Sequence, residues 1–111
     1  MHACSCTACQ RRSGSAFSCT AFFPETALTV VSGDPRSWQR PGDSGQGVES
    51  AFCPECGTTL LSRPLAWAGM VGVAVGCFDE RDLGPPARLY WAQSRPPWLA
   101  MPAQVELCPT Q

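Results

Sequence analysis

Three cysteines near the start of the chain, Cys4, Cys6 and Cys9, have the spacing of a metal-binding loop. In a C-x-C-x-x-C segment, the side chains of alternate and next-turn residues converge, so all three can bind one ion. Three thiolates leave one position of a tetrahedral zinc open, which is typical of catalytic zinc. Water, hydroxide or a substrate thiolate can be activated at that position. The cluster therefore predicts a reactive zinc centre.

A second pair, Cys53 and Cys56, belongs to a Cys-Pro-Glu-Cys-Gly segment that has the form of a zinc knuckle. Pro54 favours the turn between the two thiols, and Gly57 permits a left-handed backbone after it. Two thiolates fill only half of a four-coordinate site. A second C-x-x-C usually follows downstream, but only the isolated Cys77 lies there. The pair predicts a metal site whose other ligands come from elsewhere in the protein.

Other interpretations of the cysteines stay open. Cys53 and Cys56 could form a redox dithiol or a disulfide, although redox motifs normally open a helix in a βαβ unit that is not predicted here. The first cluster could instead complete the tetrahedron of the knuckle, giving one closed site without chemistry. The remaining cysteines stand alone among apolar residues and prolines, and we expect them to be buried as small hydrophobic side chains. They are Cys19, Cys77 and Cys108.

Four residues directly after the first cluster, Arg11, Arg12, Ser13 and Gly14, are candidates for substrate binding. The two guanidinium groups would lower the pKa values of nearby thiols and attract an anionic ligand toward the metal. The alternative is that these four residues form a surface turn without a ligand.

The elements that must position these residues are short. Eleven Pro and ten Gly are scattered through 111 residues, and no window shows a clean helical apolar period, so long helices are not expected. Runs rich in apolar and β-branched residues predict antiparallel strands over 16–23, 28–31, 48–52, 58–61, 71–75 and 88–92. The glycine-rich segment 41–47 predicts a mobile loop. The prediction is a mainly β fold in a single domain over residues 1–111.

Composition and charge exclude several classes of function. The formal net charge is -1, with eight Arg and no Lys, so no charged surface suited to nucleic acid or to an anionic membrane is expected. The longest apolar run, 65–78, is shorter than the roughly 20 residues that cross a bilayer. The first residues lack the basic and apolar segments of a secretory signal. We therefore expect a cytoplasmic protein with reduced thiols.

The order of these motifs resembles that of the glutathione-dependent formaldehyde-activating enzyme (GFA) family, also called the centromere protein V domain family. The resemblance rests on the C-x-C-x-x-C segment with the following Gln-Arg-Arg-Ser-Gly, and on Phe-Cys-Pro-Glu-Cys-Gly-Thr at 52–58. A Gly-Cys-Phe-Asp segment at 76–79 and Pro-Pro-Trp at 96–98 extend it, so it covers nearly the whole chain from Cys4 to Trp98. It implies a β-tent of short antiparallel sheets held by zinc knuckles.

The resemblance also implies two zinc ions. Cys4, Cys6 and Cys9 would hold the catalytic zinc, and Cys53 and Cys56 would be half of a structural site with four thiolates. The family activity is that of a carbon–sulfur lyase, which adds glutathione to formaldehyde to give S-(hydroxymethyl)glutathione or runs the reverse reaction. We expect the same class of reaction here, on glutathione or a related thiol–aldehyde adduct. A non-catalytic zinc-binding module is the alternative.

The sequence departs from the family pattern at two points. In the family, a C-x-C on an N-terminal strand supplies the other half of the structural site, and this chain starts after that strand. The domain is therefore expected to be truncated at its N-terminus, with the knuckle short of two ligands. The alternatives are that the knuckle is empty, or that another thiol completes it; if Cys4 or Cys6 did so, the catalytic cluster would be dismantled. Ser5 also stands where the family often has histidine, so any proton transfer by that residue would be lost.

Overall fold

The computed structural model describes residues 1–41 and 46–111. Residues 42–45, which belong to the loop predicted over 41–47, lie outside the described residues. The chain forms two compact units, one made of residues 1–21 and 78–111 and the other of residues 22–77. The first cysteine cluster lies in the first unit, and the Cys53–Cys56 pair lies in the second.

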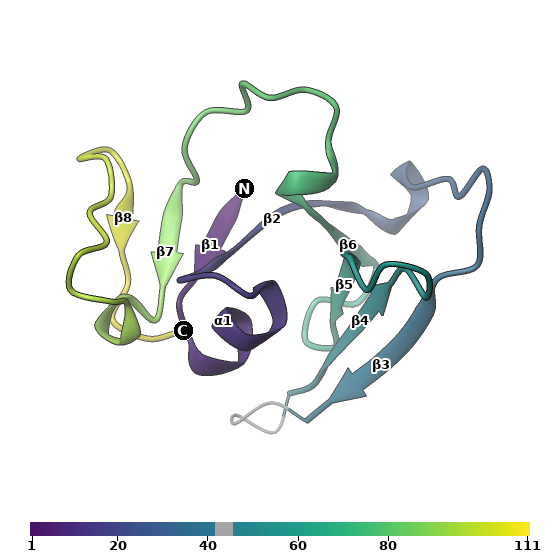
Figure 1. The fold of residues 1–111 in the computed structure, drawn as a ribbon, viewed down its shortest axis with the longest axis horizontal. Helices are drawn as coiled ribbons and strands as arrows, with labels where there is room; N and C mark the ends of the chain where they lie inside the picture. The colour runs from purple at the N-terminus through teal and green to yellow at the C-terminus, as the bar shows by residue number, and fades with distance from the viewer. Residues whose placement is uncertain (42–45) are drawn as a thin grey trace. The chain divides into compact units, whose positions relative to one another are not determined.

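The first unit is built around two short neighbouring strands, β1 and β7 (Figure 1). Its elements are β1 (His2–Cys4), α1 (Thr7–Ser13), the start of β2 (Ser18–Pro24), β7 (Arg88–Tyr90), the 3-10 turn η3 (Ala92–Ser94) and β8 (Glu106–Leu107). The strands follow the order β2, β1, β7, β8. β1 runs antiparallel to β2 and parallel to β7, and β7 runs parallel to β8.

A small apolar core lies beneath β1 and β7. Ala3 and Leu89 are opposite one another in the parallel pair and are 1% and 0% exposed, and Ala92 and Val105 complete the buried cluster. Because side chains alternate along a strand, Ala3 faces this core while its neighbour Cys4 faces away from it. The burial of Ala3 therefore decides on which face of β1 the first thiol of the cluster emerges.

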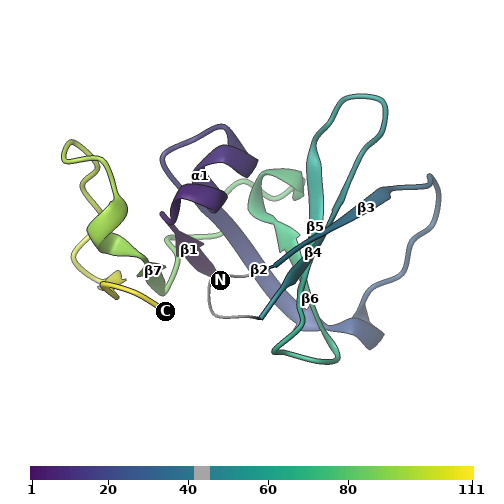
Figure 2. The ribbon, with the colours of Figure 1, turned by 90° about the horizontal axis from the view of Figure 1, so that it is seen from below.

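The second unit is an antiparallel meander (Figure 1 and Figure 2). Its elements are η1 (Glu25–Ala27), β3 (Arg36–Arg40), β4 (Val48–Phe52), β5 (Thr59–Pro64), β6 (Met70–Ala74) and η2 (Val75–Cys77), with the strands side by side in chain order. The register shifts by one residue between Ala51 and Phe52, at the end of β4. The Cys53–Cys56 turn follows this irregularity and connects β4 to β5.

The prediction of a mainly β fold is confirmed. Predicted strands 16–23, 48–52, 58–61, 71–75 and 88–92 correspond to β2, β4, β5, β6 and β7. The predicted strand 28–31 is wrong: it pairs with no strand of the described residues, and Val30 and Val31 are 57% and 90% exposed. Its β-branched residues match a strand in type but are not covered by any partner.

The expected antiparallel pairing holds in the second unit but not throughout the first. The β1–β7 and β7–β8 pairs are parallel. A parallel pair needs a long crossover connection, and its partners lie far apart in the chain, so local patterns do not reveal it. None of the helices in the described part of the chain has the length and apolar character needed to span a bilayer.

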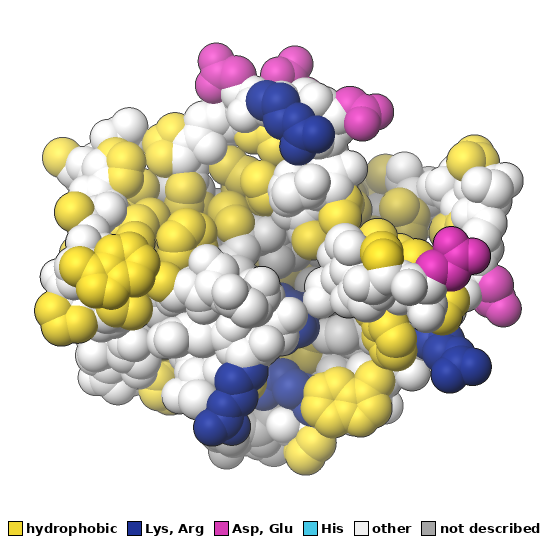
Figure 3. All heavy atoms as spheres, viewed as in Figure 1, with side chains coloured by type: hydrophobic (Ala, Val, Ile, Leu, Met, Phe, Trp, Pro, Cys, Tyr) yellow, Lys and Arg dark blue, Asp and Glu magenta, His cyan; other side chains and the backbone are white. Residues whose placement is uncertain are grey.

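Charged side chains are exposed in small groups. The stretch 79–82, which follows η2, is exposed and contains Asp79, Glu80, Arg81 and Asp82. On the face drawn in Figure 3, arginine side chains occur in small groups, and one at the top is flanked by acidic side chains.

An ion pair in the second unit gives a stability that depends on pH. The guanidinium of Arg63 donates from Nη2 to Glu25 Oε1 over 2.8 Å and from Nε to both carboxylate oxygens. These hydrogen bonds, with the charge of Arg63, lower the pKa of Glu25 below its ordinary value. A group with a depressed folded-state pKa stabilises the fold above its unfolded pKa, and that stabilisation is lost as the pH falls through the folded-state value.

We therefore expect Glu25→Gln to lower the thermal unfolding midpoint at neutral pH, by a small amount because the pair is solvent-exposed. The difference from the wild type should vanish once the pH falls below the folded-state pKa of Glu25. Circular dichroism melts at a series of pH values measure both effects. Asp34→Asn, at an exposed position outside this pair, is the matched control. A difference that persists in strong acid would contradict the assignment.

Candidate metal centre

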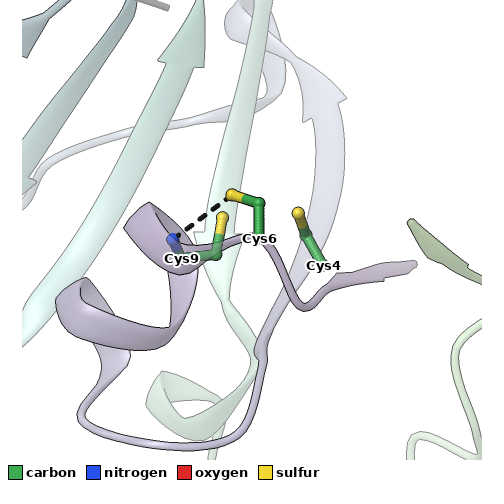
Figure 4. Close-up of side chains that lie close together, drawn as sticks. All are labelled: Cys4, Cys6 and Cys9. Atoms are coloured by element: carbon green, nitrogen blue, oxygen red, sulfur yellow. Dashed lines mark hydrogen bonds between the residues drawn. The ribbon is translucent and has the colours of Figure 1, made fainter. Parts of the chain in front are cut away.

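The end of β1 and the start of α1 bring Cys4, Cys6 and Cys9 together. Cys4 ends β1, Cys6 is the N-cap of α1, and Cys9 lies in its first turn. Cys6 has an extended backbone, and its Sγ accepts a hydrogen bond from the Cys9 backbone N–H over 3.4 Å. The three Sγ atoms lie within 4.8 Å of one another. Figure 4 shows the three side chains gathered at the junction of the strand and the helix.

Ser5 fixes the backbone between the first two cysteines. It is 0% exposed, its N–H donates to the Tyr90 carbonyl over 3.0 Å, and its hydroxyl donates to the Ala16 carbonyl over 3.1 Å. Both hydrogen-bond donors of this buried residue are therefore satisfied by backbone carbonyls. Sequence reasoning treated Ser5 only as the loss of a histidine and missed this structural role.

Gln10 is a second residue that sequence reasoning did not assign to the site. Its side-chain amide nitrogen donates to the Ser5 carbonyl over 2.6 Å and to the Ser94 carbonyl over 3.0 Å. These bonds connect α1 to the C-x-C segment and to η3. The position of Cys9, one residue before Gln10, is thus set relative to both.

The thiols of Cys4 and Cys9 share a proton unequally. The hydrogen bond from Cys4, together with contacts from the Ser18 hydroxyl and the charge of Arg12, lowers the pKa of Cys9 to about 5 despite its burial. The same hydrogen bond and burial raise the pKa of Cys4. Both shifts have the same main cause, a hydrogen bond in which the Cys4 thiol donates to the Cys9 sulfur. A metal ion that binds here must displace that proton.

The four residues predicted to bind substrate have different surroundings. Arg12 is half-buried, and its Nη2 donates to Ser18 Oγ over 3.4 Å, which directs it toward the thiols. Arg11 is exposed. The Ser13 hydroxyl donates to the backbone carbonyls of Gln10 and Phe17. Gly14 ends the helix. Substrate binding by these residues stays a prediction.

Gly14 ends α1 in the left-handed region, with φ 64°, and its N–H donates to the Gln10 carbonyl. Non-glycine residues are strained there, so we expect Gly14→Ala to lower the free energy of unfolding by about 1 kcal/mol. Gly76→Ala is the control, because Gly76 lacks a positive φ and a Cβ built there meets no heavy atom within 4 Å. Urea unfolding measures both, and equal losses in the two variants would contradict the strain argument.

The donor set of the first cluster fits a zinc ion. Three thiolates bound to zinc at about 2.3 Å lie roughly 3.8 Å apart, so the observed separations require only small side-chain rotations. Sulfur ligands favour soft or borderline ions such as Zn²⁺ over Mg²⁺ or Ca²⁺. The arrangement can therefore hold one zinc ion and leave a coordination position for another ligand.

Cys53 and Cys56 lie in a tight turn of the second unit. The Gly57 N–H donates to the Cys53 carbonyl over 2.8 Å, and the Cys53 N–H donates to the Thr58 carbonyl over 2.9 Å. Gly57 has the left-handed backbone that the sequence predicted, with φ 74°. Within residues 1–41 and 46–111, Cys4, Cys6 and Cys9 are the group in which three possible metal donors meet, so the pair stands as two donors.

The lone cysteines differ from the expectation at one position. Cys19 packs against the core of the first unit, and Cys108 is half-buried. Cys77 is exposed, so the prediction that it is a buried hydrophobic side chain is wrong. The last turn before the end of the second unit carries it to the surface, where its Sγ donates to the Thr59 carbonyl over 3.5 Å.

The fold and the site define a mainly β protein with a candidate three-thiol metal centre. The chain belongs to the GFA family: the family model described as glutathione-dependent formaldehyde-activating enzyme matches residues 1–94. The match includes both cysteine motifs and confirms the resemblance drawn from them. No curated protein sequence matches the chain.

Proposed function

We propose that the chain is a zinc-dependent carbon–sulfur lyase that forms or cleaves an adduct between an aldehyde and glutathione or a related thiol. The observation that carries the proposal is the convergence of Cys4, Cys6 and Cys9 within 4.8 Å in a member of the GFA family. A bound zinc would supply a Lewis-acidic open position able to activate a thiol or polarise an aldehyde oxygen.

The proposed reaction is an addition without redox change. The thiol sulfur forms a bond to the aldehyde carbon, and the thiol proton ends on the aldehyde oxygen. In this scheme Ser18 and Arg12 stabilise negative charge on Cys9, which keeps its sulfur available as a metal ligand. In this proposal Arg11, which is exposed, attracts the carboxylates of glutathione from solvent.

Turnover of formaldehyde and glutathione tests the proposal. Zinc-loaded protein should accelerate formation of S-(hydroxymethyl)glutathione, which NMR exchange spectroscopy measures. Removal of zinc by a chelator should abolish this acceleration. Cys4→Ser should abolish it as well. Cys77→Ser, at an exposed position outside the cluster, is the control and should keep full activity. Activity that survives zinc removal or Cys4→Ser would overturn the mechanism.

One observation favours a second candidate function, a non-catalytic zinc-binding module. Ser5 is buried with its hydroxyl bound to a backbone carbonyl, so the C-x-C segment contributes no side chain that can transfer a proton. A module of this kind would bind zinc through the same cysteines without accelerating adduct formation. Zinc at full occupancy together with no turnover of several thiol–aldehyde pairs would favour it.

A cytoplasmic location is part of the same proposal. All eight cysteines are free thiols in the structure, and metal binding by thiolates requires that they stay reduced. The cytoplasm maintains reduced thiols. Fluorescence microscopy of a tagged chain would test the location.

A further inference from the structure

β3 is the outermost strand of the second unit. It pairs with β4 on one side, and no strand of the described residues pairs with its other side (Figure 1). Residues 36–39 of this strand are exposed. The outer edge of such a strand presents a row of backbone N–H and C=O groups that can pair with another extended chain. The edge of β3 is therefore accessible to a further strand.

One face of β3 carries two arginines and a tryptophan. Because side chains alternate along a strand, Arg36, Trp38 and Arg40 project from the same face. Trp38 lies between the two arginines along the strand and is 59% exposed. This face of the edge strand therefore combines an exposed aromatic ring with two positive charges.

No carboxylate of the described residues neutralises this face. Neither of its arginines takes part in an ion pair within that part of the chain. The acidic residue of β4, Glu49, projects from the opposite face, where it pairs with Arg63 over 3.7 Å. The residues of β4 that lie opposite the two arginines and the tryptophan are uncharged: Phe52, Ser50 and Val48. The two positive charges are therefore available to a ligand.

The same charges disfavour pairing of β3 with a second copy of the chain. If two β3 strands paired antiparallel about Trp38, Arg36 of one copy would lie opposite Arg40 of the other. Like charges directly opposite one another destabilise a strand pair. Protection of the edge from such pairing needs only the charges, and it gives no reason for a large exposed indole between them. The face matches a partner of opposite charge.

We propose that β3 binds an extended acidic segment of a partner protein as an additional strand of the sheet. Backbone hydrogen bonds along the edge supply affinity, and the alternate side chains supply specificity. Two acidic residues four positions apart in the segment lie opposite Arg36 and Arg40, and an apolar residue midway between them covers the ring of Trp38. Opposite charges directly across two strands stabilise the pair.

This surface is distinct from the candidate metal centre. β3 belongs to the unit of residues 22–77, whereas Cys4, Cys6 and Cys9 belong to the other unit. The proposal therefore does not depend on the proposed lyase activity. A single-stranded nucleic acid is less well matched, because it needs a positively charged groove that follows its backbone, and the net charge of this chain is -1.

A synthetic peptide tests the proposal on the whole chain. The acetylated and amidated peptide Thr-Glu-Thr-Val-Thr-Glu-Thr is added to isotope-labelled protein, and backbone amide NMR signals are followed. The signals of β3 should shift, and hydrogen exchange along β3 should slow, because N–H groups that faced solvent then donate to the peptide. The same peptide with lysine in place of both glutamates should not bind.

Matched variants assign binding to the charged face. Arg36→Gln and Arg40→Gln should each weaken binding of the glutamate peptide by up to about 5-fold, and together by up to about 30-fold. Trp38→Ala should weaken it as well. Arg81→Gln removes an exposed arginine of the other unit and should bind the peptide like the wild type. Circular dichroism checks that each variant is folded.

Four outcomes would overturn the proposal. The first is a set of β3 signals that the glutamate peptide does not move. The second is equal binding of the lysine peptide, or unchanged affinity in the double arginine variant. The third is tighter binding of oligothymidine than of the peptide, which would assign the face to nucleic acid. The fourth is a dimer of the chain that Trp38→Ala dissociates, which would assign the edge to a second copy.

Discussion

Cys9→Ser is expected to lower the affinity of the first cluster for zinc by more than about 100-fold, which exceeds the usual effect of losing an outer-shell partner. The variant removes one of three thiolates, and it removes the one whose pKa is already lowered to about 5. Serine does not ionise at neutral pH, so the site is left with two sulfur donors. Competition with a colorimetric zinc chelator measures the loss.

Two further variants bracket this result. Ser18→Ala removes a hydroxyl that lowers the pKa of Cys9 without touching a ligand, so we expect a loss of about 10–100-fold in zinc affinity. Cys77→Ser should have no effect at this cluster. Zinc binding should also weaken as the pH falls, because protons compete for the sulfur atoms, with Cys4 retaining its proton most strongly. Unchanged affinity in Cys9→Ser would mean that the cluster is not the zinc site.

Leu89→Ala is expected to be the most destabilising core substitution, lowering the free energy of unfolding by about 2–5 kcal/mol. Leu89 is 0% exposed and lies opposite Ala3 in the β1–β7 pair. The small side chain of Ala3 is itself buried and cannot fill the cavity that the truncation leaves. Since whole domains are stable by only about 5–15 kcal/mol, this loss is a large share of the total.

Urea unfolding of Leu89→Ala and Leu107→Ala compares the same truncation at a buried and at an exposed leucine. The difference between their losses therefore reports core packing and not the type of side chain. Leu107 is 45% exposed in β8, so its truncation should cost less than about 1 kcal/mol. The Leu89 core supports the strand that ends at Cys4. Zinc that binds the folded cluster should therefore raise the unfolding midpoint of Leu89→Ala by mass action. Similar losses in the two variants would show that the core is not centred on Leu89.

The arrangement of the cysteine motifs was predictable because it depends on residues close together in the chain. Cys4, Cys6 and Cys9 are close in the chain, so their spacing alone predicted that they meet, and Gly57 predicted the left-handed turn after Cys56. The prediction required no knowledge of the tertiary fold, because β1 and α1 are consecutive. The same reasoning predicted β4, β5 and β6 from their apolar runs, but it missed β3, whose residues are mostly polar and exposed.

The partners of the site were not predictable in this way. Ser18 reaches Cys9 because β2 pairs with β1 in a register that places Ser18 opposite Cys4. Gln10 donates to the backbone carbonyl of Ser94, which lies far along the chain. Strand pairing across long separations has no local sequence signature, and β1 itself, three residues long, was missed for lack of length. The exposed position of Cys77 likewise depends on where the chain turns.

The parallel pairing of β1 with β7 affects when the metal centre can form during synthesis. Cys4 is held opposite Tyr90, so the strand that carries the first thiol has β2 beside it early in synthesis but lacks β7, its other neighbour, until Tyr90 has been added. At about 5–20 residues per second, this delay lasts several seconds. During that time the thiols of a nascent chain are unpositioned and open to oxidation or to capture of the wrong metal. The reducing power of the compartment therefore acts on these thiols before the fold can protect them.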